Sequence, residues 1–153
     1  MKLKRILLKL SGEALSSRDS VFDRKILDFL AAEIKKIQEI GIEIGIVCGG
    51  GNILRGAAFS HTNDSLSRLA GDQMGMLSTV INSIAIQQSL TEKGCPNFLF
   101  SSVTIDGIAP RFNHLRAQEL LNNKKIVIIA GGTGNPYFST DTSAVLRALE
   151  IQS

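Results

Sequence analysis

The hydrophobic residues of this chain follow two alternating patterns, short continuous runs and longer segments of helical period. Short apolar runs predict β-strands at residues 4–10, 42–47, 97–100 and 125–130. Apolar residues that recur every three or four positions predict helices over 23–40, 66–92, 113–121 and 140–150. A further short helix is expected after Asn52. In the last helix, the residues expected to face inward are Ala144, Val145, Ala148 and Leu149.

Polar and glycine residues support these boundaries. Asp23 and Asn113 each precede a helical segment and are expected to cap it, and Gly41 is expected to end the first helix. The alternation of strands with helices predicts an α/β fold, a three-layer αβα sandwich around a mainly parallel sheet. Because four strands are few for such a sheet and the pattern stops after a helix, we expect the fold to be incomplete at its C-terminal end.

The composition excludes several classes of protein. The 153 residues are 44% hydrophobic and 20% charged, as in an ordinary soluble domain. Cys48 and Cys95 lie far apart and are expected to be reduced and buried. A net charge of +3 with 5% aromatic residues and no tryptophan argues against a nucleic-acid partner. The apolar run at the start is too short for a signal peptide or a membrane helix, so we expect a cytoplasmic protein without a membrane partner.

Three glycine-bearing turns each follow a predicted strand. They are Ser11-Gly12, Gly49-Gly50-Gly51 and Gly131-Gly132-Thr133-Gly134. Ligands of parallel sheets gather at the carboxyl ends of the strands, and glycine lets backbone N–H groups approach an anion closely. A single such turn is more often only a tight turn, but three at one edge favour a phosphate site. The segment 51–56 continues with Ala57 and is no Walker A loop, and the dinucleotide fingerprint is absent too.

Four charged residues near these turns are candidates, each with a plainer alternative. Lys9 lies near the end of the first strand and is expected to face a ligand unless it is an edge-strand lysine that reaches solvent. Arg55 follows the second turn and is suited to clamping a phosphate, unless it is a solvated surface residue. Asp72 lies beside the helical Gly71 and Gly75. It is expected to accept hydrogen bonds from ribose hydroxyls, unless it is a solvated carboxylate. Asp141 orients a lysine or a metal, or complements the dipole of the last helix.

Four segments together resemble the bacterial uridylate (UMP) kinases, which are members of the amino acid kinase family. They are residues 4–15, 49–56, 71–82 and 132–141. The resemblance implies the reaction ATP + UMP → ADP + UDP in pyrimidine nucleotide biosynthesis, with Mg²⁺ accompanying ATP. It also implies that residues 1–153 are the N-terminal, UMP-binding portion of the domain and that most of the ATP site is not included. Residues 16–22 differ from the glycine-bearing stretch of many members, which places activation by GTP in doubt.

The resemblance assigns roles to individual residues. The implied catalytic residues are Lys9, Arg55 and Asp141. The implied ATP-binding residues are Lys9, Leu10, Ser11, Gly12, Gly51 and Arg55. The implied UMP-binding residues are Gly50, Asp72, Thr133, Gly134, Asn135, Pro136, Tyr137, Phe138, Ser139 and Thr140. No residue is implied as a metal ligand.

The resemblance further implies a homohexamer that uses the long helix in subunit contacts, with UTP as an inhibitor. Two alternatives stay open. One is a nucleotide-binding module without catalysis. The other is an amino acid kinase that acts on a carboxylate or carbamate, against which Asp72 and the loop 133–140 argue.

Overall fold

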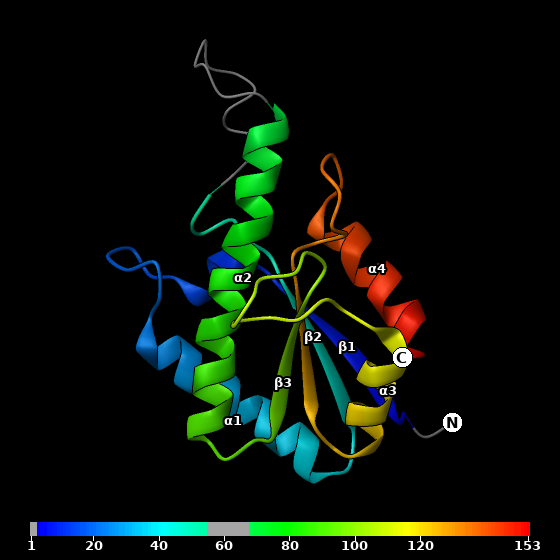
Figure 1. Ribbon diagram of the computed structural model, residues 1–153. Coiled ribbons are helices and arrows are strands. Elements are labelled where there is room, and N and C mark those ends of the chain that lie inside the picture. The colour runs from blue at the N-terminus through cyan, green and yellow to red at the C-terminus, as the bar shows by residue number, and fades with distance from the viewer. Residues whose placement is uncertain (1–2, 55–67) are drawn as a thin grey trace.

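A four-stranded parallel sheet forms the centre of the molecule. The computed structural model describes residues 3–54 and 68–153. Its strands are β1 (Arg5–Leu10), β2 (Glu43–Cys48), β3 (Asn97–Ser101) and β4 (Ile126–Ala130). They lie in the order β1-β2-β4-β3, and every neighbouring pair is parallel (Figure 1). The α/β prediction with a parallel sheet is therefore confirmed.

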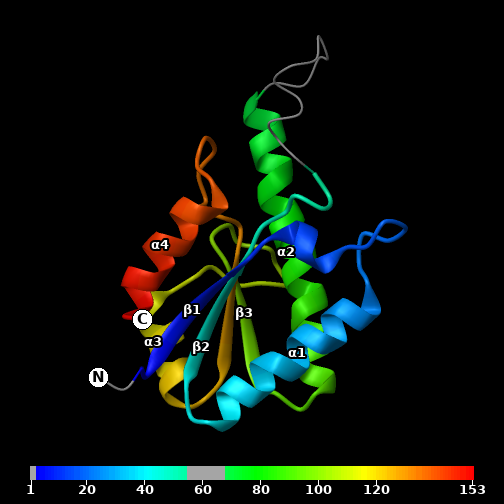
Figure 2. The same cartoon turned by 180° about the vertical axis from the view of Figure 1, so that it is seen from behind.

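Helices cover both faces of this sheet. They are α1 (Arg24–Glu39), α2 (Arg68–Glu92), α3 (His114–Asn122) and α4 (Thr140–Ile151), and a 3₁₀ helix, η1 (Gly12–Leu15), follows β1. The paired helices α1 and α2 lie on one face, and α3 and α4 lie on the other (Figures 1 and 2). The predicted three-layer arrangement is thus confirmed. In the part of the chain that the structure describes, no helix combines the length and apolar character needed to cross a membrane.

Local sequence signals account for where the helices begin and end. The side chain of Asp23 accepts hydrogen bonds from the backbone of Lys25 and Ile26 at the start of α1. Asn113 caps α3 in the same way, through the backbone N–H of Arg116. After the second glycine turn, the residues up to 54 form a single turn closed on the Gly50 carbonyl. The remainder of the short helix expected there lies outside the described residues.

Alternate residues of the central strands contribute to two separate cores. On β2 and β4, Ile44, Ile46, Ile126 and Ile128 pack under α1 and α2. Residues that point to the opposite face of the same strands, Val47, Val127 and Ile129, pack under α3 and α4. Both central strands are buried on both faces, as their apolar runs predict.

Helix α4 differs from the expectation in the face that it buries, and α2 leaves several of its apolar residues exposed. In α4 the prediction that Val145 and Leu149 face inward is wrong, because they are 61% and 72% exposed. The prediction is confirmed for Ala144, and the helix also buries Ser143, Arg147 and Ile151, a face that includes a charged residue. In α2 the apolar residues Leu77 and Ile81 are also exposed. The face that α2 buries consists largely of small and polar residues, including Ser78, Thr79, Asn82 and Ser83.

Candidate functional site

The first two glycine turns pack directly against each other at the carboxyl ends of β1 and β2. A Cβ atom on Gly12 would lie 2.6 Å from the Gly49 carbonyl oxygen and 2.8 Å from the Gly51 nitrogen. A Cβ atom on Gly50 would lie 2.9 Å from the carbonyl oxygen of Gly75 on α2. Since real Cβ atoms do not approach backbone so closely, these positions need glycine. The β2 turn is thus held between η1 and α2.

A buried asparagine of α2 fixes the shape of this β2 turn. The Asn82 side chain is fully buried and donates to the Gly49 carbonyl at 2.7 Å. It also exchanges hydrogen bonds with the side chain of Asn52. Neither asparagine was expected from the sequence to have a role in the site. The apolar periodicity of α2 gave no signal for Asn82, because this residue lies on a different face of the helix from Leu77 and Ile81.

The third glycine turn follows β4 and packs against the end of β3. Gly131 has a φ of +78°, and a Cβ atom on it would lie 2.6 Å from the Ser101 side-chain oxygen. Its backbone N–H donates to the Thr79 hydroxyl of α2 at 2.8 Å. Gly134 also has a positive φ and lies against Ser102. The loop that begins here is therefore tied at its start to α2 and β3.

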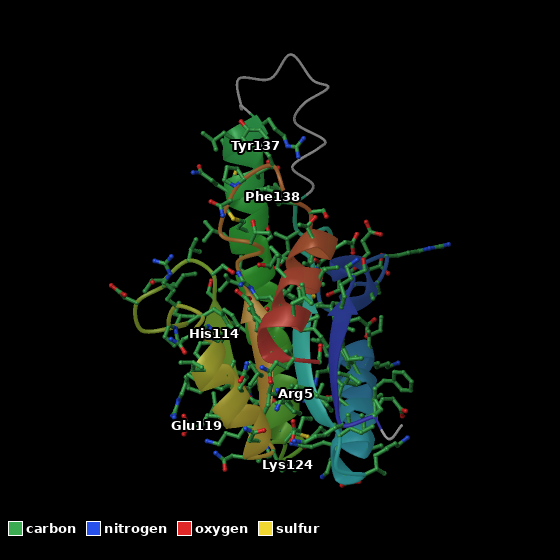
Figure 3. The ribbon with its side chains drawn as sticks, turned by 90° about the vertical axis from the view of Figure 1, so that its right-hand side faces the viewer. Arg5, His114, Glu119, Lys124, Tyr137 and Phe138 are labelled. Carbon is green, nitrogen blue, oxygen red and sulfur yellow. The ribbon has the colours of Figure 1, made fainter. Side chains whose placement is uncertain are left out.

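A polar pocket of about 240 Å³ opens between this loop, the β2 turn and α2. Its lining comprises Gly50, Gly51, Leu54, Arg68, Gly71, Asp72, Gly75, Met76, Thr79, Gly132, Thr133, Asn135, Phe138, Ser139 and Thr140. A Cβ atom on Gly75 would have no described atom within 4 Å, so this glycine faces open space. Figure 3 shows Tyr137 and Phe138 on the loop beside the first turns of α2. The sequence had not identified Arg68, Met76 or Thr79 as part of this site.

Asp72 joins α2 to the loop on one wall of the pocket. Its carboxylate accepts hydrogen bonds from Arg68, one turn earlier on α2, at 2.8 and 3.0 Å. It also accepts the backbone N–H of Tyr137 at 2.8 Å. The Arg68 guanidinium in turn lies 5.8 Å from the centre of the Tyr137 ring. A carboxylate offers about four acceptor positions, so Asp72 retains capacity for a hydroxyl group in the pocket.

Lys9 and Asp141 meet beside the pocket. The Lys9 ammonium lies 2.9 Å from a carboxylate oxygen of Asp141, and the two side chains are 38% and 75% exposed. Lys9 lies on β1, at the edge of the described sheet, and Asp141 lies in the first turn of α4. The neighbouring Thr140 hydroxyl would lie 3.7 Å from a Cβ atom on Gly49. The start of α4 therefore brings an acidic residue to the first two glycine turns.

The other predicted residues fall around the pocket or outside the described chain. Among the described residues, the pocket lining does not include Lys9, Leu10, Ser11, Gly12, Gly134, Pro136, Tyr137 or Asp141. Leu10 accepts the backbone N–H of Gly49 at 2.9 Å and so links β1 to the β2 turn. Arg55 lies outside the described residues.

Among the described residues, the cysteines and acidic side chains form neither a disulfide nor a metal cluster. Both cysteines are free and buried, as expected. Burial raises the pKa of the Cys48 thiol to about 12, although nearby Lys9 opposes the shift, so the thiol is protonated at neutral pH. In residues 3–54 and 68–153, no three histidine, cysteine, aspartate or glutamate side chains form a cluster able to hold a metal ion.

The chain carries glycine turns suited to binding phosphate on a parallel sheet. Its match to a known protein family agrees with this arrangement. The model of the amino acid kinase family matches residues 4–153. The chain belongs to the amino acid kinase family. A uridylate kinase of Bartonella bacilliformis is 46% identical over 153 residues, which are 99% of this chain and 63% of that protein.

Solved structures of family members share the fold. The crystal structure of UMP kinase from Ureaplasma parvum has a TM-score of 0.91 and 32% identity, and the match covers 100% of this chain and 66% of that chain. The crystal structure of UMP kinase from Bacillus anthracis has a TM-score of 0.91 and 40% identity, covering 98% of this chain and 62% of that chain. This chain thus spans less than two thirds of the length of these relatives.

Proposed function

We propose that residues 1–153 are the N-terminal, acceptor-binding portion of a UMP kinase, which transfers the γ-phosphoryl group of ATP to UMP and releases ADP and UDP. The observation that carries the proposal is the pocket between α2 and the loop after β4, with the Lys9–Asp141 pair beside it. The names of similar family members, uridylate kinase and UMP kinase, support UMP as the acceptor.

The acceptor residues divide into a ribose contact and a loop. Asp72 would accept hydrogen bonds from the ribose hydroxyls of UMP, since it faces the pocket and has acceptor capacity left. Gly50 would let the nucleotide approach the β2 turn without a side chain in the way. The loop would hold the rest of the nucleotide through Thr133, Gly134, Asn135, Pro136, Tyr137, Phe138, Ser139 and Thr140.

The donor residues would neutralise charge on the phosphoryl group in transit. Lys9 would place its ammonium group at the transferring phosphoryl, and Asp141, 2.9 Å away, would hold the ammonium in position. Leu10, Ser11, Gly12 and Gly51 would bring the backbone of the first two turns to the phosphates of ATP, and Arg55 would add a forked cation. Mg²⁺ would arrive bound to ATP, and we assign it no ligand among the described residues.

Calorimetric titration of this chain with UMP tests the proposal. We expect saturable binding of UMP and no binding of a small carboxylate or a carbamate, the acceptors of the alternative kinase. Addition of MgATP, followed by an assay for UDP, then separates a catalytic chain from one that binds UMP without transfer. Preference for a carboxylate acceptor over UMP would contradict the assignment.

We also propose that the chain assembles as a homo-oligomer through α2, with a hexamer as the form that the family resemblance implies. Met74, Leu77, Ile81 and Ile84 are spaced so that they share one face of α2, and each is 39–50% exposed. A contiguous exposed apolar face of this kind favours burial against another surface. Inhibition by UTP rests on the resemblance alone.

A further inference from the structure

Arg147 is a buried charged residue that no step of the proposed reaction uses. It lies on the third turn of α4 and is 8% exposed. Its guanidinium carbon lies 4.6 Å from the centre of the Phe112 ring, and one of its terminal nitrogens pairs with Glu150. Its Nε has no hydrogen-bond partner among the described residues. An incompletely paired buried charge contributes little to stability compared with an apolar residue of similar size.

The remaining terminal nitrogen of Arg147 points to a different role. It donates to the Ser102 hydroxyl at 2.9 Å, and this hydroxyl donates to the Gly132 carbonyl at 2.6 Å. Ser102 also lies against Gly134, where a Cβ atom would be 3.3 Å away from the serine. The guanidinium therefore fixes the donor direction of the Ser102 hydroxyl, because a hydroxyl that accepts from a cation turns its own hydrogen toward another acceptor.

The same helix thereby holds both ends of the loop after β4. Ser139 caps the start of α4 at the end of the loop, through the backbone N–H of Thr142. Arg147, two turns later, reaches back through Ser102 to Gly132 at the start of the loop. Thr133 lines both the acceptor pocket and a second polar pocket to which Arg147 contributes. A shift of Arg147 would therefore be transmitted directly to a wall of the acceptor pocket.

We propose that Arg147 is a positioning residue for the UMP-binding loop, acting through Ser102 on Gly132. The inference rests on the proposed function for the meaning of that loop. Asp72 holds the later part of this loop through the Tyr137 backbone. The start of the loop is held independently of Asp72, by the contacts of Thr79 with Gly131 and of Ser102 with Gly132.

The test combines two variants with two measurements. Arg147→Met retains an unbranched stem and removes the donors, and Ser102→Ala removes the relay with little change of volume. We expect each to weaken UMP binding about tenfold in calorimetry. Because both interrupt one relay, the double variant should bind about as weakly as either single variant rather than about a hundredfold more weakly. Amide hydrogen exchange at residues 132–135 should be faster in each variant.

Arg116→Met is the matched control, since this exposed arginine of α3 pairs with Glu119 and lies outside the acceptor pocket. It should change neither measurement. Additive losses in the double variant, or unchanged loop exchange in Ser102→Ala, would overturn the proposal, and Ser102→Ala decides it even if Arg147→Met does not fold. If the wild-type chain binds no UMP, the proposed function fails, whereas the exchange measurement still reports on the relay.

Discussion

Asp72 is the residue whose substitution separates binding from stability most clearly. Replacing it with asparagine removes the negative charge but keeps an oxygen that can accept from Tyr137. The lost ion pair joins Arg68 and Asp72, one turn apart in α2, whose side chains are 46% and 14% exposed, and pairs at this spacing contribute only about 0.5 kcal/mol. We therefore expect Asp72→Asn to weaken UMP binding by about tenfold or more, measured by calorimetry, with an almost unchanged melting temperature.

A matched control for this variant exists on α1. Asp28 pairs with Arg24 at the same spacing as Asp72 with Arg68, but away from the pocket. Asp28→Asn should leave UMP affinity unchanged. Equal affinities in the two variants would remove Asp72 from the site.

Substitution of Gly131 tests why the third turn needs glycine. The reason is either the backbone conformation alone or also the lack of room for a side chain. Gly41 has a similar φ, +89°, but a Cβ atom on it would meet no described atom within 4 Å. Gly41→Ala should therefore lower the free energy of unfolding by only about 1 kcal/mol, which is the cost of placing alanine in the left-handed conformation. Gly131→Ala adds close contacts with Ser101 and Ser102 and should cost about 3 kcal/mol or more in urea unfolding. Similar losses in both variants would show that close packing at Gly131 is not important.

At the scale of the elements, the sequence predicted the secondary structure better than it predicted which helix faces are buried. Continuous apolar runs identify β2 and β4 because both of their faces are covered, and capping residues such as Asp23 locate the helix starts. In α2 and α4 the face against the sheet carries small, polar or charged residues, including Asn82 and Arg147. These residues are buried because of hydrogen bonds to other elements, which periodicity along one helix does not reveal.

Sequence patterns likewise identified only part of the candidate site. The glycine turns could be placed at one edge of the sheet because parallel strands end together. One alternative for Asp141 was that it orients a lysine, and its carboxylate pairs with Lys9. Thr79 and Ser102, which hold the loop after β4, are far from it in sequence. Thr79 lies in the segment 71–82 that carries the resemblance, but neither residue had been given a role. Their role follows from tertiary packing.

A buried ionic cluster ties β1, β2 and the end of α3 together at the opposite end of the sheet. Glu43 is 3% exposed and accepts hydrogen bonds from Arg5 at 2.8 Å and Lys124 at 3.2 Å. Figure 3 shows Arg5 and Lys124 close to each other at the lower end of the molecule. Burial by itself would raise the pKa of Glu43, but the hydrogen bonds from Arg5 and Lys124 outweigh it and hold the pKa below the ordinary value of 4.5.

This cluster predicts how stability depends on pH. Because the pKa of Glu43 is lower in the folded chain, the carboxylate stabilises the fold at pH values above 4.5, and this contribution is lost as the pH falls through the folded-state pKa. Glu43→Gln leaves Arg5 and Lys124 without their anion and should cost about 3 kcal/mol at pH 7 in urea unfolding. The difference from wild type should shrink at acidic pH. A difference that stays constant from pH 7 to pH 3 would contradict this role.

At the scale of the whole molecule, α2 presents its apolar face outward. Leu77 and Ile81 are 50% and 47% exposed on that face. We expect light scattering to show a multiple of the 16.5 kDa chain, and a smaller species when both residues are replaced by glutamate. Leu115→Glu, at a 65% exposed leucine of α3, is the control and should leave the mass unchanged. A monomeric wild-type chain, or an unchanged mass in the double variant, would contradict assembly through α2.

The central claim is that the pocket between α2 and the loop after β4 binds UMP. The most direct test is calorimetric titration of the chain with UMP, with and without Asp72→Asn. The account predicts saturable binding at one site per chain that Asp72→Asn weakens by about tenfold or more while the chain stays folded. Absence of UMP binding by the folded wild-type chain, or the same affinity in Asp72→Asn, would contradict it.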